Sequence, residues 1–226
     1  MRVNLIIVTL SFFKIRCMLN KIPINYKVDG GLVFIQEFLK HPLQIGSIIP
    51  SSRYLERRIV ATAGIASANI VVELGAGTGG ITRAILRAMP QHAKLLSIEI
   101  NPHFHTLLKN IEDDRLIVHL GSAYELKEII SLYDLDVPNV VISGIPFSSM
   151  SHSTGTQILK AISSQLTPNG RFVAYQVSNR VATLCQPFLG SGQTTTEFLN
   201  IPPMRIFQWE KDAYQGAPAD AKKRRG

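Results

Sequence analysis

From residue 70 onward, hydrophobic residues follow two periods that alternate along the chain. Segments with apolar positions three and four residues apart, typical of helices with one buried face, separate short and nearly continuous apolar runs. Such runs are typical of strands that are buried on both faces of a sheet. The runs occupy residues 70–74, 94–100, 116–120, 139–143 and 171–177. This alternation predicts a parallel sheet covered by helices.

The segments between these runs carry the marks of helices. Pro90 closes the first segment, and the second begins with Asn101 as N-cap and Pro102 in the first turn. Another helix is expected around residues 124–132, between the third and fourth strands. The side chains that we expect to face the sheet are Ile81, Ala84, Ile85, Ala88, Met89, Phe104, Leu107, Leu108, Ile158, Ile162 and Leu166.

The pattern changes near the C-terminus, where two β-type runs follow each other closely. Residues 194–199 and 204–209 are separated by only a few residues around Pro202 and Pro203, which favours a hairpin. The predicted fold class is therefore α/β. Five strands linked by helices, followed by this hairpin, make a seven-stranded, mostly parallel sheet with an antiparallel C-terminal hairpin.

The segment before residue 60 forms a separate zone. Apolar residues at helical spacing predict an amphipathic helix around residues 31–40, and Ser51 and Ser52 can cap a helix that begins near Arg53. The chain is thereby divided into a basic, membrane-facing N-terminal extension (1–45), a central domain (46–210) and a basic C-terminal tail (211–226).

The formal charge of +8 is concentrated at the two ends of the chain. Residues 1–60 hold nine Lys and Arg against three Asp and Glu, a net +6, and residues 211–226 hold five against two, a net +3. Residues 61–210 hold ten against eleven, a net −1. Basic ends favour a polyanionic partner, either a nucleic acid backbone or an anionic lipid surface.

Composition excludes several classes of protein. A chain of 226 residues with 46% hydrophobic and 18% charged residues suits one globular domain and excludes disordered, collagen-like and disulfide-rich chains. The longest apolar run, residues 5–13, is too short for a membrane-spanning helix, which needs roughly 20 residues. Cys17 and Cys185 have neither metal-ligand nor redox spacing, so we expect no metal site and a reducing cytoplasm.

A glycine-rich loop follows the first strand. Residues 73–80 read Glu-Leu-Gly-Ala-Gly-Thr-Gly-Gly, and such glycines let the backbone approach a ligand closely. The glycines alone also satisfy the dinucleotide fingerprint, so they leave nicotinamide cofactors open. Glu99 ends the second strand, where a carboxylate can accept both ribose hydroxyls. Glu73, which can organise the loop and a ligand's positive amino end, moves the interpretation towards S-adenosylmethionine.

These features, with the closing hairpin, resemble the class I S-adenosylmethionine-dependent methyltransferases over about residues 45–210. The resemblance implies a Rossmann-like sheet and S-adenosyl-L-methionine as the cofactor. The residues that it implies for cofactor binding are Ser51, Glu73, Gly75, Ala76, Gly77, Gly79, Glu99, Ile100, Ser122 and Ala123.

The loop after the fourth strand resembles the one with which amino-group methyltransferases hold a target nitrogen. Its backbone carbonyls and aromatic ring can orient an amine lone pair at the sulfonium methyl, and methyl transfer gains mainly from such positioning. Tyr54, Ser148 and His152 are candidate helpers in proton removal. The residues to which the resemblance assigns catalysis are Ser143, Gly144, Ile145, Pro146 and Phe147.

A narrower resemblance connects the chain with the bacterial phospholipid N-methyltransferases, which are related to the rRNA adenine dimethyltransferases. Residues 38–42 and 46–53 resemble the segment that helps cover the methyl donor in this family, and residues 200–203 resemble its pattern before the last strand. The resemblance implies methylation of the phosphatidylethanolamine headgroup, stepwise towards phosphatidylcholine. It also implies a monomer that is peripheral on the inner face of the cytoplasmic membrane.

Other functions stay open at this point. An rRNA adenine dimethyltransferase is weakened because Ser143 and Gly144 replace its leading Asn or Asp and because no further RNA-binding domain is expected after residue 210. Nucleic acid is therefore not an expected partner. A non-catalytic, membrane-associated S-adenosylmethionine-binding protein and a nicotinamide oxidoreductase are the remaining alternatives.

Overall fold

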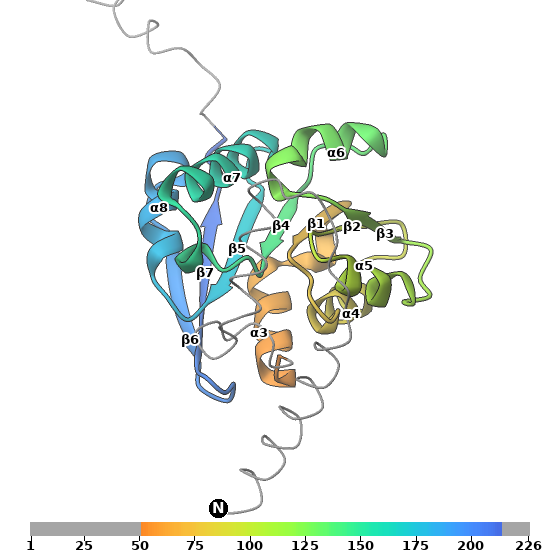
Figure 1. Ribbon diagram of the computed structural model, residues 1–226, viewed down its shortest axis with the longest axis horizontal. Helices are drawn as coiled ribbons and strands as arrows, with labels where there is room; N and C mark the ends of the chain where they lie inside the picture. Colours follow the sequence, from red (N-terminus) through yellow and green to blue (C-terminus); the bar gives the residue numbers. More distant parts are fainter. Residues whose placement is uncertain (1–50, 214–226) are drawn as a thin grey trace, which may run out of the picture. The chain divides into compact units, whose positions relative to one another are not determined.

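Seven strands form one mixed sheet in the computed structural model, which describes residues 51–213 (Figure 1). Neighbouring strands follow the order β3-β2-β1-β4-β5-β7-β6. The first five strands are parallel, and β7 runs antiparallel to both of its neighbours. Their bounds are β1 Ile70–Leu74, β2 Lys94–Glu99, β3 Leu116–Leu120, β4 Val140–Ser143, β5 Arg171–Gln176, β6 Gln193–Glu197 and β7 Met204–Glu210. The predicted α/β fold with its C-terminal hairpin is confirmed.

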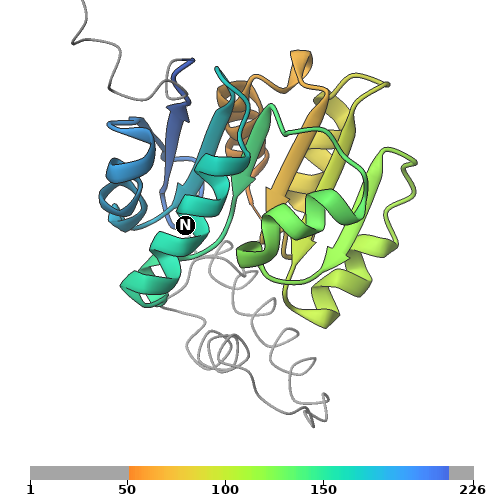
Figure 2. The same ribbon diagram turned by 90° about the horizontal axis from the view of Figure 1, so that it is seen from above.

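Helices lie on both faces of the sheet (Figure 2). One buried cluster lies between the sheet and α3 and α4, and a second lies between the opposite face and α6, α7 and α8. The helices are α3 Arg53–Ala63, α4 Gly80–Ala88, α5 Pro102–Lys109, α6 Leu126–Leu132, α7 His152–Gln165 and α8 Arg180–Leu189. Short 3-10 turns are η1 Ile65–Ser67, η2 Ala123–Glu125 and η3 Phe147–Ser149.

The capping residues act as their sequence positions predict. The Ser52 hydroxyl accepts the Leu55 N–H at 3.1 Å, and the Asn101 side chain accepts the His103 N–H at 2.9 Å. Each of these bonds satisfies a backbone donor that has no partner within its own helix. Pro102 occupies the first position of α5, where its missing N–H costs nothing.

One local prediction is wrong, and one helix was not predicted. Leu107, expected to face the sheet, is 37% exposed, because the short helix α5 turns only Leu108 fully into the core. The helix α8 was not predicted at all, since it carries Pro187 in its interior and lies where the pattern changes from strand–helix repeats to a hairpin. The N-terminal extension, the segment 38–50 and the tail from residue 214 lie outside the described residues.

The strand order locates the place where a ligand can bind. β1 lies between β2 and β4, so the chain leaves the centre of the sheet in one direction after β1 and in the other after β4. Loops that diverge at such a point leave a crevice at the carboxyl ends of the strands. The glycine-rich loop after β1 and the loop after β4 both begin there.

Candidate active site

Backbone hydrogen bonds join the carboxyl ends of three strands. The Gly75 N–H donates to the Ile98 carbonyl oxygen of β2 at 2.9 Å, and the Gly144 N–H donates to the Leu74 carbonyl oxygen of β1 at 2.9 Å. The first residues after β1 and β4 are thereby held side by side. The two loops to which the sequence assigned the cofactor and the target amine meet at one point.

Within the glycine-rich loop, Gly77 faces open space. Its φ of 57° lies in the left-handed region, and a Cβ built on it would meet no atom within 4 Å. Gly75, at φ 74°, differs, because an added Cβ would lie 3.2 Å from the Ile145 side chain. Gly79, at φ 81°, is the N-cap of α4, whose free N–H groups give this end of the loop a partial positive charge. The loop therefore packs on one side and offers its backbone to a ligand on the other.

The Glu99 carboxylate is fixed beneath this loop by two backbone donors. Its Oε2 accepts the Gly77 N–H at 2.8 Å, and its Oε1 accepts the Asn101 N–H at 2.9 Å. Each oxygen keeps a lone pair for a further donor. Burial raises the pKa of Glu99, while the two backbone donors oppose the rise. Two spare acceptors at the end of β2 are what a pair of ribose hydroxyls requires.

Glu73 lies deeper, on β1, and is fully buried. Its Oε2 accepts hydrogen bonds from the Thr82 hydroxyl of α4 at 2.7 Å and the Ser97 hydroxyl of β2 at 3.0 Å. Its Oε1 has no partner among the described residues. Burial raises the pKa of Glu73 to about 7. The carboxyl group thus ties β1, β2 and α4 together under the glycine-rich loop, and its contact with a ligand's amino end stays a prediction.

Hydrogen bonds within the loop after β4 fix its conformation. The Ser143 hydroxyl accepts the Ile145 N–H at 3.2 Å, and the Ile145 carbonyl oxygen accepts the Phe147 N–H at 3.0 Å. Gly144, Ile145 and Pro146 are half-buried. The Phe147 ring, which we expected to face a target amine, is fully buried in the core. It is enclosed because the chain turns into η3 at this residue, which places the ring in the core beneath the sheet-covering helices.

Two residues at the end of β5 complete the loop, and the sequence analysis did not identify them. A Cβ on Gly144 would collide with the Tyr175 hydroxyl and would lie 2.8 Å from the Gly75 carbonyl oxygen. The Gln176 side chain donates to the Ile145 carbonyl oxygen at 2.8 Å, and its own buried Oε1 has no partner among residues 51–213. Burial raises the pKa of Tyr175, and the carboxylates of Glu73 and Glu99 add to the rise, so the phenol keeps its proton. The signal that could have identified them is their position, as polar residues at the carboxyl end of the strand beside β4.

The remaining expected cofactor residues lie along the same edge. Ile100 follows β2, and Ser122 and Ala123 follow the neighbouring β3, where Ser122 caps η2. Ser51 precedes α3 and is half-buried, and Ala76 is buried within the glycine-rich loop. The candidate proton helpers Tyr54, Ser148 and His152 are all exposed.

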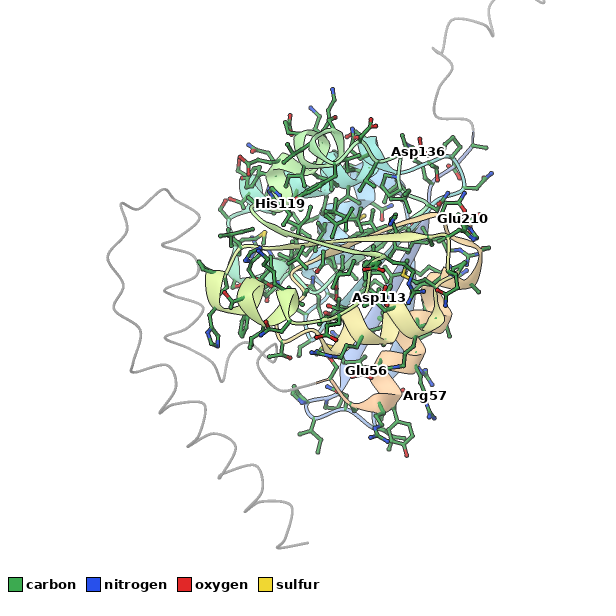
Figure 3. The ribbon with its side chains drawn as sticks, turned by 90° about the vertical axis from the view of Figure 1, so that its right-hand side faces the viewer. Glu56, Arg57, Asp113, His119, Asp136 and Glu210 are labelled. Atoms are coloured by element: carbon green, nitrogen blue, oxygen red, sulfur yellow. The ribbon has the colours of Figure 1, made fainter. Side chains whose placement is uncertain are left out.

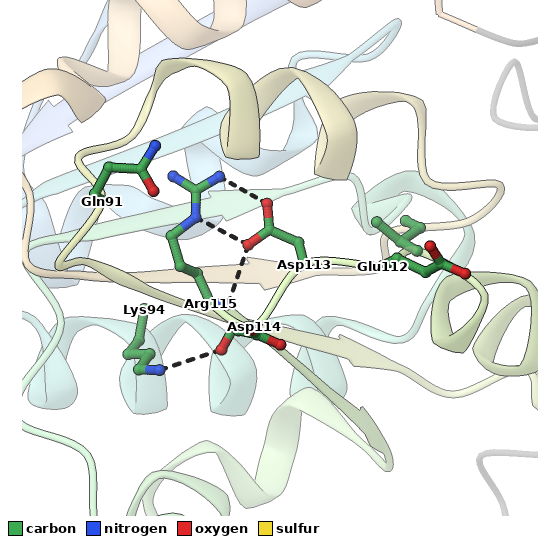
Figure 4. A pocket seen from close by; sticks show the side chains of 7 residues that line it. Gln91, Lys94, Glu112, Asp113, Asp114 and Arg115 are labelled. Atoms are coloured by element: carbon green, nitrogen blue, oxygen red, sulfur yellow. Dashed lines mark hydrogen bonds and ion pairs between the residues drawn. The ribbon is translucent and has the colours of Figure 1, made fainter.

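A pocket lined by acidic and basic side chains lies at the other end of the sheet, near the amino ends of β2 and β3 (Figure 4). It is lined by Lys94, the first residue of β2, and by residues 111–115, which precede β3. Arg115 forms a two-bond ion pair with Asp113, at 2.9 and 2.7 Å, and donates to the Leu86 carbonyl oxygen of α4 at 2.8 Å. These groups satisfy one another and the end of α4, so the pocket has a structural explanation.

Two general findings concern residues 51–213. No group of three or more His, Cys, Asp or Glu side chains there is arranged to hold a metal ion. No helix in this part of the chain has both the length and the apolar character needed to cross a membrane.

Comparison with known proteins gives relatives of two kinds, and no family model matches the chain. An ornithine lipid N-methyltransferase from Singulisphaera acidiphila is 30% identical over 142 residues, which cover 62% of this chain and 74% of that protein. The ribosomal RNA small subunit methyltransferase A of Syntrophotalea carbinolica is 33% identical over 93 residues, which cover 41% of this chain but only 33% of the relative. Among solved structures, the N-methyltransferase NodS from Bradyrhizobium japonicum matches the fold with a TM-score of 0.58 at 8% identity, covering 70% of this chain and 94% of that one.

Proposed function

Because the chain belongs to the class I S-adenosylmethionine-dependent methyltransferases, we propose that it methylates the headgroup amine of a membrane lipid. When bound, S-adenosylmethionine supplies an electrophilic methyl group on a sulfonium centre. The part that this chain plays is to hold the donor, hold the amine beside it and keep the two aligned, which can contribute several kcal/mol to a bimolecular reaction.

The residues at the carboxyl edge fit this cofactor. The open space beside Gly77 is a cradle that a side chain would fill, and it adjoins the spare acceptors of Glu99. The unpartnered Oε1 of Glu73 is a buried acceptor under the same loop. We assign the nucleoside to Gly77 and Glu99, with Ile100, Ser122 and Ala123 beside it, and the cationic end of the donor to the loop above Glu73.

The observation that carries the proposal is the direct contact between the two loops. Gly144 bonds to the last residue of β1, and Ile145 lies against Gly75. An amine held by the loop after β4 is then beside a donor held by the loop after β1. Because Gly144 leaves no room for a Cβ, the approach is this close only with glycine there.

The target amine is an alkylammonium ion at neutral pH and must lose its proton before it can attack. Residues 143–147 include no titratable side chain, and Tyr175 beside them stays protonated. We therefore assign proton removal to water at the open side of the site. The loop contributes position, which suits an amine that already titrates within a few pH units of neutrality.

Two observations support a lipid amine, rather than an adenine amine, as the methyl acceptor. The relative that is 30% identical is named for ornithine lipid, and the resemblance to the phospholipid N-methyltransferases implies phosphatidylethanolamine; both lipids present a primary amine. The rRNA methyltransferase of Syntrophotalea carbinolica matches 41% of this chain and only 33% of its own length, and the loop here begins with Ser143 and Gly144. These points support a lipid amine over an adenine amine.

The test uses the full chain, S-adenosylmethionine labelled in its methyl group, and three acceptors offered separately. Mixed micelles of phosphatidylethanolamine, mixed micelles of ornithine lipid, and 16S rRNA are extracted and counted after equal times. We expect label in at least one of the lipids and none in the RNA, and strongly reduced lipid labelling with the Glu99→Gln variant when S-adenosylmethionine is kept below saturation. Label in the RNA alone would overturn the proposal.

A further inference from the structure

The loop between β6 and β7, residues 198–203, shows its apolar side chains to solvent. Phe198 is 76% exposed, Leu199 is 62% exposed and Ile201 is 73% exposed. Neighbouring exposed apolar residues of this size are unusual on a monomeric protein, and they mark contact surfaces when basic or polar residues surround them.

Two polar residues, Asn200 in this loop and Glu197 directly before it, point inward. Asn200 is 5% exposed, and its side chain accepts the Ser52 N–H at 3.0 Å and donates to the Pro202 carbonyl oxygen at 2.8 Å. Glu197 is 6% exposed, accepts the Leu199 N–H at 2.8 Å and pairs with Arg58 at 3.0 Å. The loop is therefore fixed by its polar groups with its apolar groups outside, which is the reverse of an ordinary surface loop.

The N-terminal end of α3 extends this surface. The bonds from Asn200 to Ser52 and from Glu197 to Arg58 hold the loop against α3, and Figure 1 shows the two side by side. Tyr54 on this end is 55% exposed, and Arg53 and Arg57, one helical turn apart, are also exposed. Figure 3 shows Arg57 pointing outward from the helix. An aromatic ring and two guanidinium groups beside aliphatic side chains are the chemistry of a membrane interface.

The position of this surface relates it to the candidate active site. β7 begins at Met204, and its next residue, Arg205, pairs with Gln176 at the end of β5. The loop before β7 therefore lies at the carboxyl edge of the parallel strands, the same edge as the two site loops. A partner that binds this surface therefore faces the candidate active site, whereas a partner bound at the amino ends of the strands would not.

We propose that Phe198, Leu199, Ile201 and Tyr54, with Arg53 and Arg57, form a docking surface for an anionic lipid bilayer. The apolar side chains enter the headgroup region, and the arginines face lipid phosphates, so that the candidate active site is presented to headgroups. The choice of a bilayer as partner rests on the proposed function; the existence of the surface does not.

The test reports insertion directly. The chain has a single tryptophan, Trp209, which is buried, so an indole introduced by Phe198→Trp can be followed against a shielded background. Vesicles of equal parts phosphatidylglycerol and phosphatidylcholine with brominated tails contain no primary amine and so need no catalysis. We expect strong quenching of the indole in F198W and none in L132W, because Leu132, 68% exposed, ends α6 away from this edge.

A second measurement compares vesicle binding by two double variants, each of which replaces two exposed apolar side chains with serine. Phe198→Ser with Ile201→Ser should weaken vesicle binding at least tenfold at about 1 M salt, where charge attraction is screened to about 3 Å. Leu132→Ser with Val137→Ser, also exposed but away from the carboxyl edge, should leave binding unchanged. Methyl transfer to micellar lipids is measured on the wild-type protein and on F198W. If neither protein methylates a lipid although the indole of F198W is quenched, the proposed function is refuted and the docking surface stands.

Absence of quenching in F198W together with unchanged binding by the serine pair would overturn the surface proposal. If quenching is absent and the serine pair converts a dimer into a monomer in sedimentation, the surface contacts a second copy and the bilayer assignment is wrong.

Discussion

Replacing Glu99 with glutamine changes one oxygen of a buried carboxylate that holds two backbone donors. An amide can accept from only one of the Gly77 and Asn101 N–H groups, because its nitrogen would face the other donor. Hydrogen bonds to a charged group contribute about 1.5–3 kcal/mol, and tenfold in affinity corresponds to about 1.4 kcal/mol. The amide nitrogen also cannot accept the ribose hydroxyl that we assign to that oxygen, and losing this one bond to the ligand should weaken binding of S-adenosylmethionine by about 10-fold to 100-fold.

Titration calorimetry of wild type and Glu99→Gln with S-adenosylmethionine measures this loss. Glu210→Gln is the matched control, since Glu210 ends β7 at the opposite edge and pairs with the partly exposed Arg171 at 3.5 Å (Figure 3). Burial raises the pKa of Glu99, and the ionised carboxylate is the better acceptor. Wild-type affinity should then fall as the pH drops through that raised pKa, and the affinity of the glutamine variant should not.

The reasoning would be refuted by unchanged donor affinity in a folded Glu99→Gln protein. An equal loss in Glu210→Gln would also refute it, because the effect would then come from removing any negative charge. Far-ultraviolet circular dichroism of each variant establishes that the proteins compared are folded.

Substitutions of Gly77, Glu73 and Phe147 test the other parts of the candidate active site. Gly77→Ala and Gly190→Ala both place a side chain at positive φ, 57° and 68°, in open space, and each should cost roughly 1–3 kcal/mol in urea unfolding. Only the Gly77 variant should lose donor affinity in calorimetry; equal affinities would contradict the cradle. Burial raises the pKa of Glu73 from 4.5 to about 7, so the folded protein keeps a proton that the unfolded chain releases in that interval. Wild-type stability should fall by about 2–3 kcal/mol more than that of Glu73→Gln between about pH 5 and about pH 8, and parallel curves would disprove the shift. Phe147→Ala should lower the free energy of unfolding by about 3–5 kcal/mol, because it empties a fully buried site; a loss under about 1 kcal/mol would place the ring outside the core.

Much of this architecture follows from local features of the chain. The continuous apolar runs mark strands that are covered on both faces, and five of them lie within one or two residues of their predicted bounds. Caps such as Ser52 and Asn101 depend on groups two or three residues away, so their neighbours alone reveal them. The glycine-rich loop and Glu99 were identified in the same way, as turn chemistry and a strand end.

Only the tertiary structure decided how distant residues face one another. The partners of Glu73 come from α4 and β2, and Tyr175 and Gln176 reach the loop after β4 because β5 pairs with β4. Phe147 was predicted to face a ligand and is buried instead, since packing against α8 and α7 is a property of the assembled layer. The loop before β7 likewise contains both polar and apolar residues, and from the sequence alone it is predicted only as the connection of a hairpin. Which of them face inward is set by α3, whose contact with Asn200 crosses 148 positions of the sequence, a separation at which periodicity carries no information.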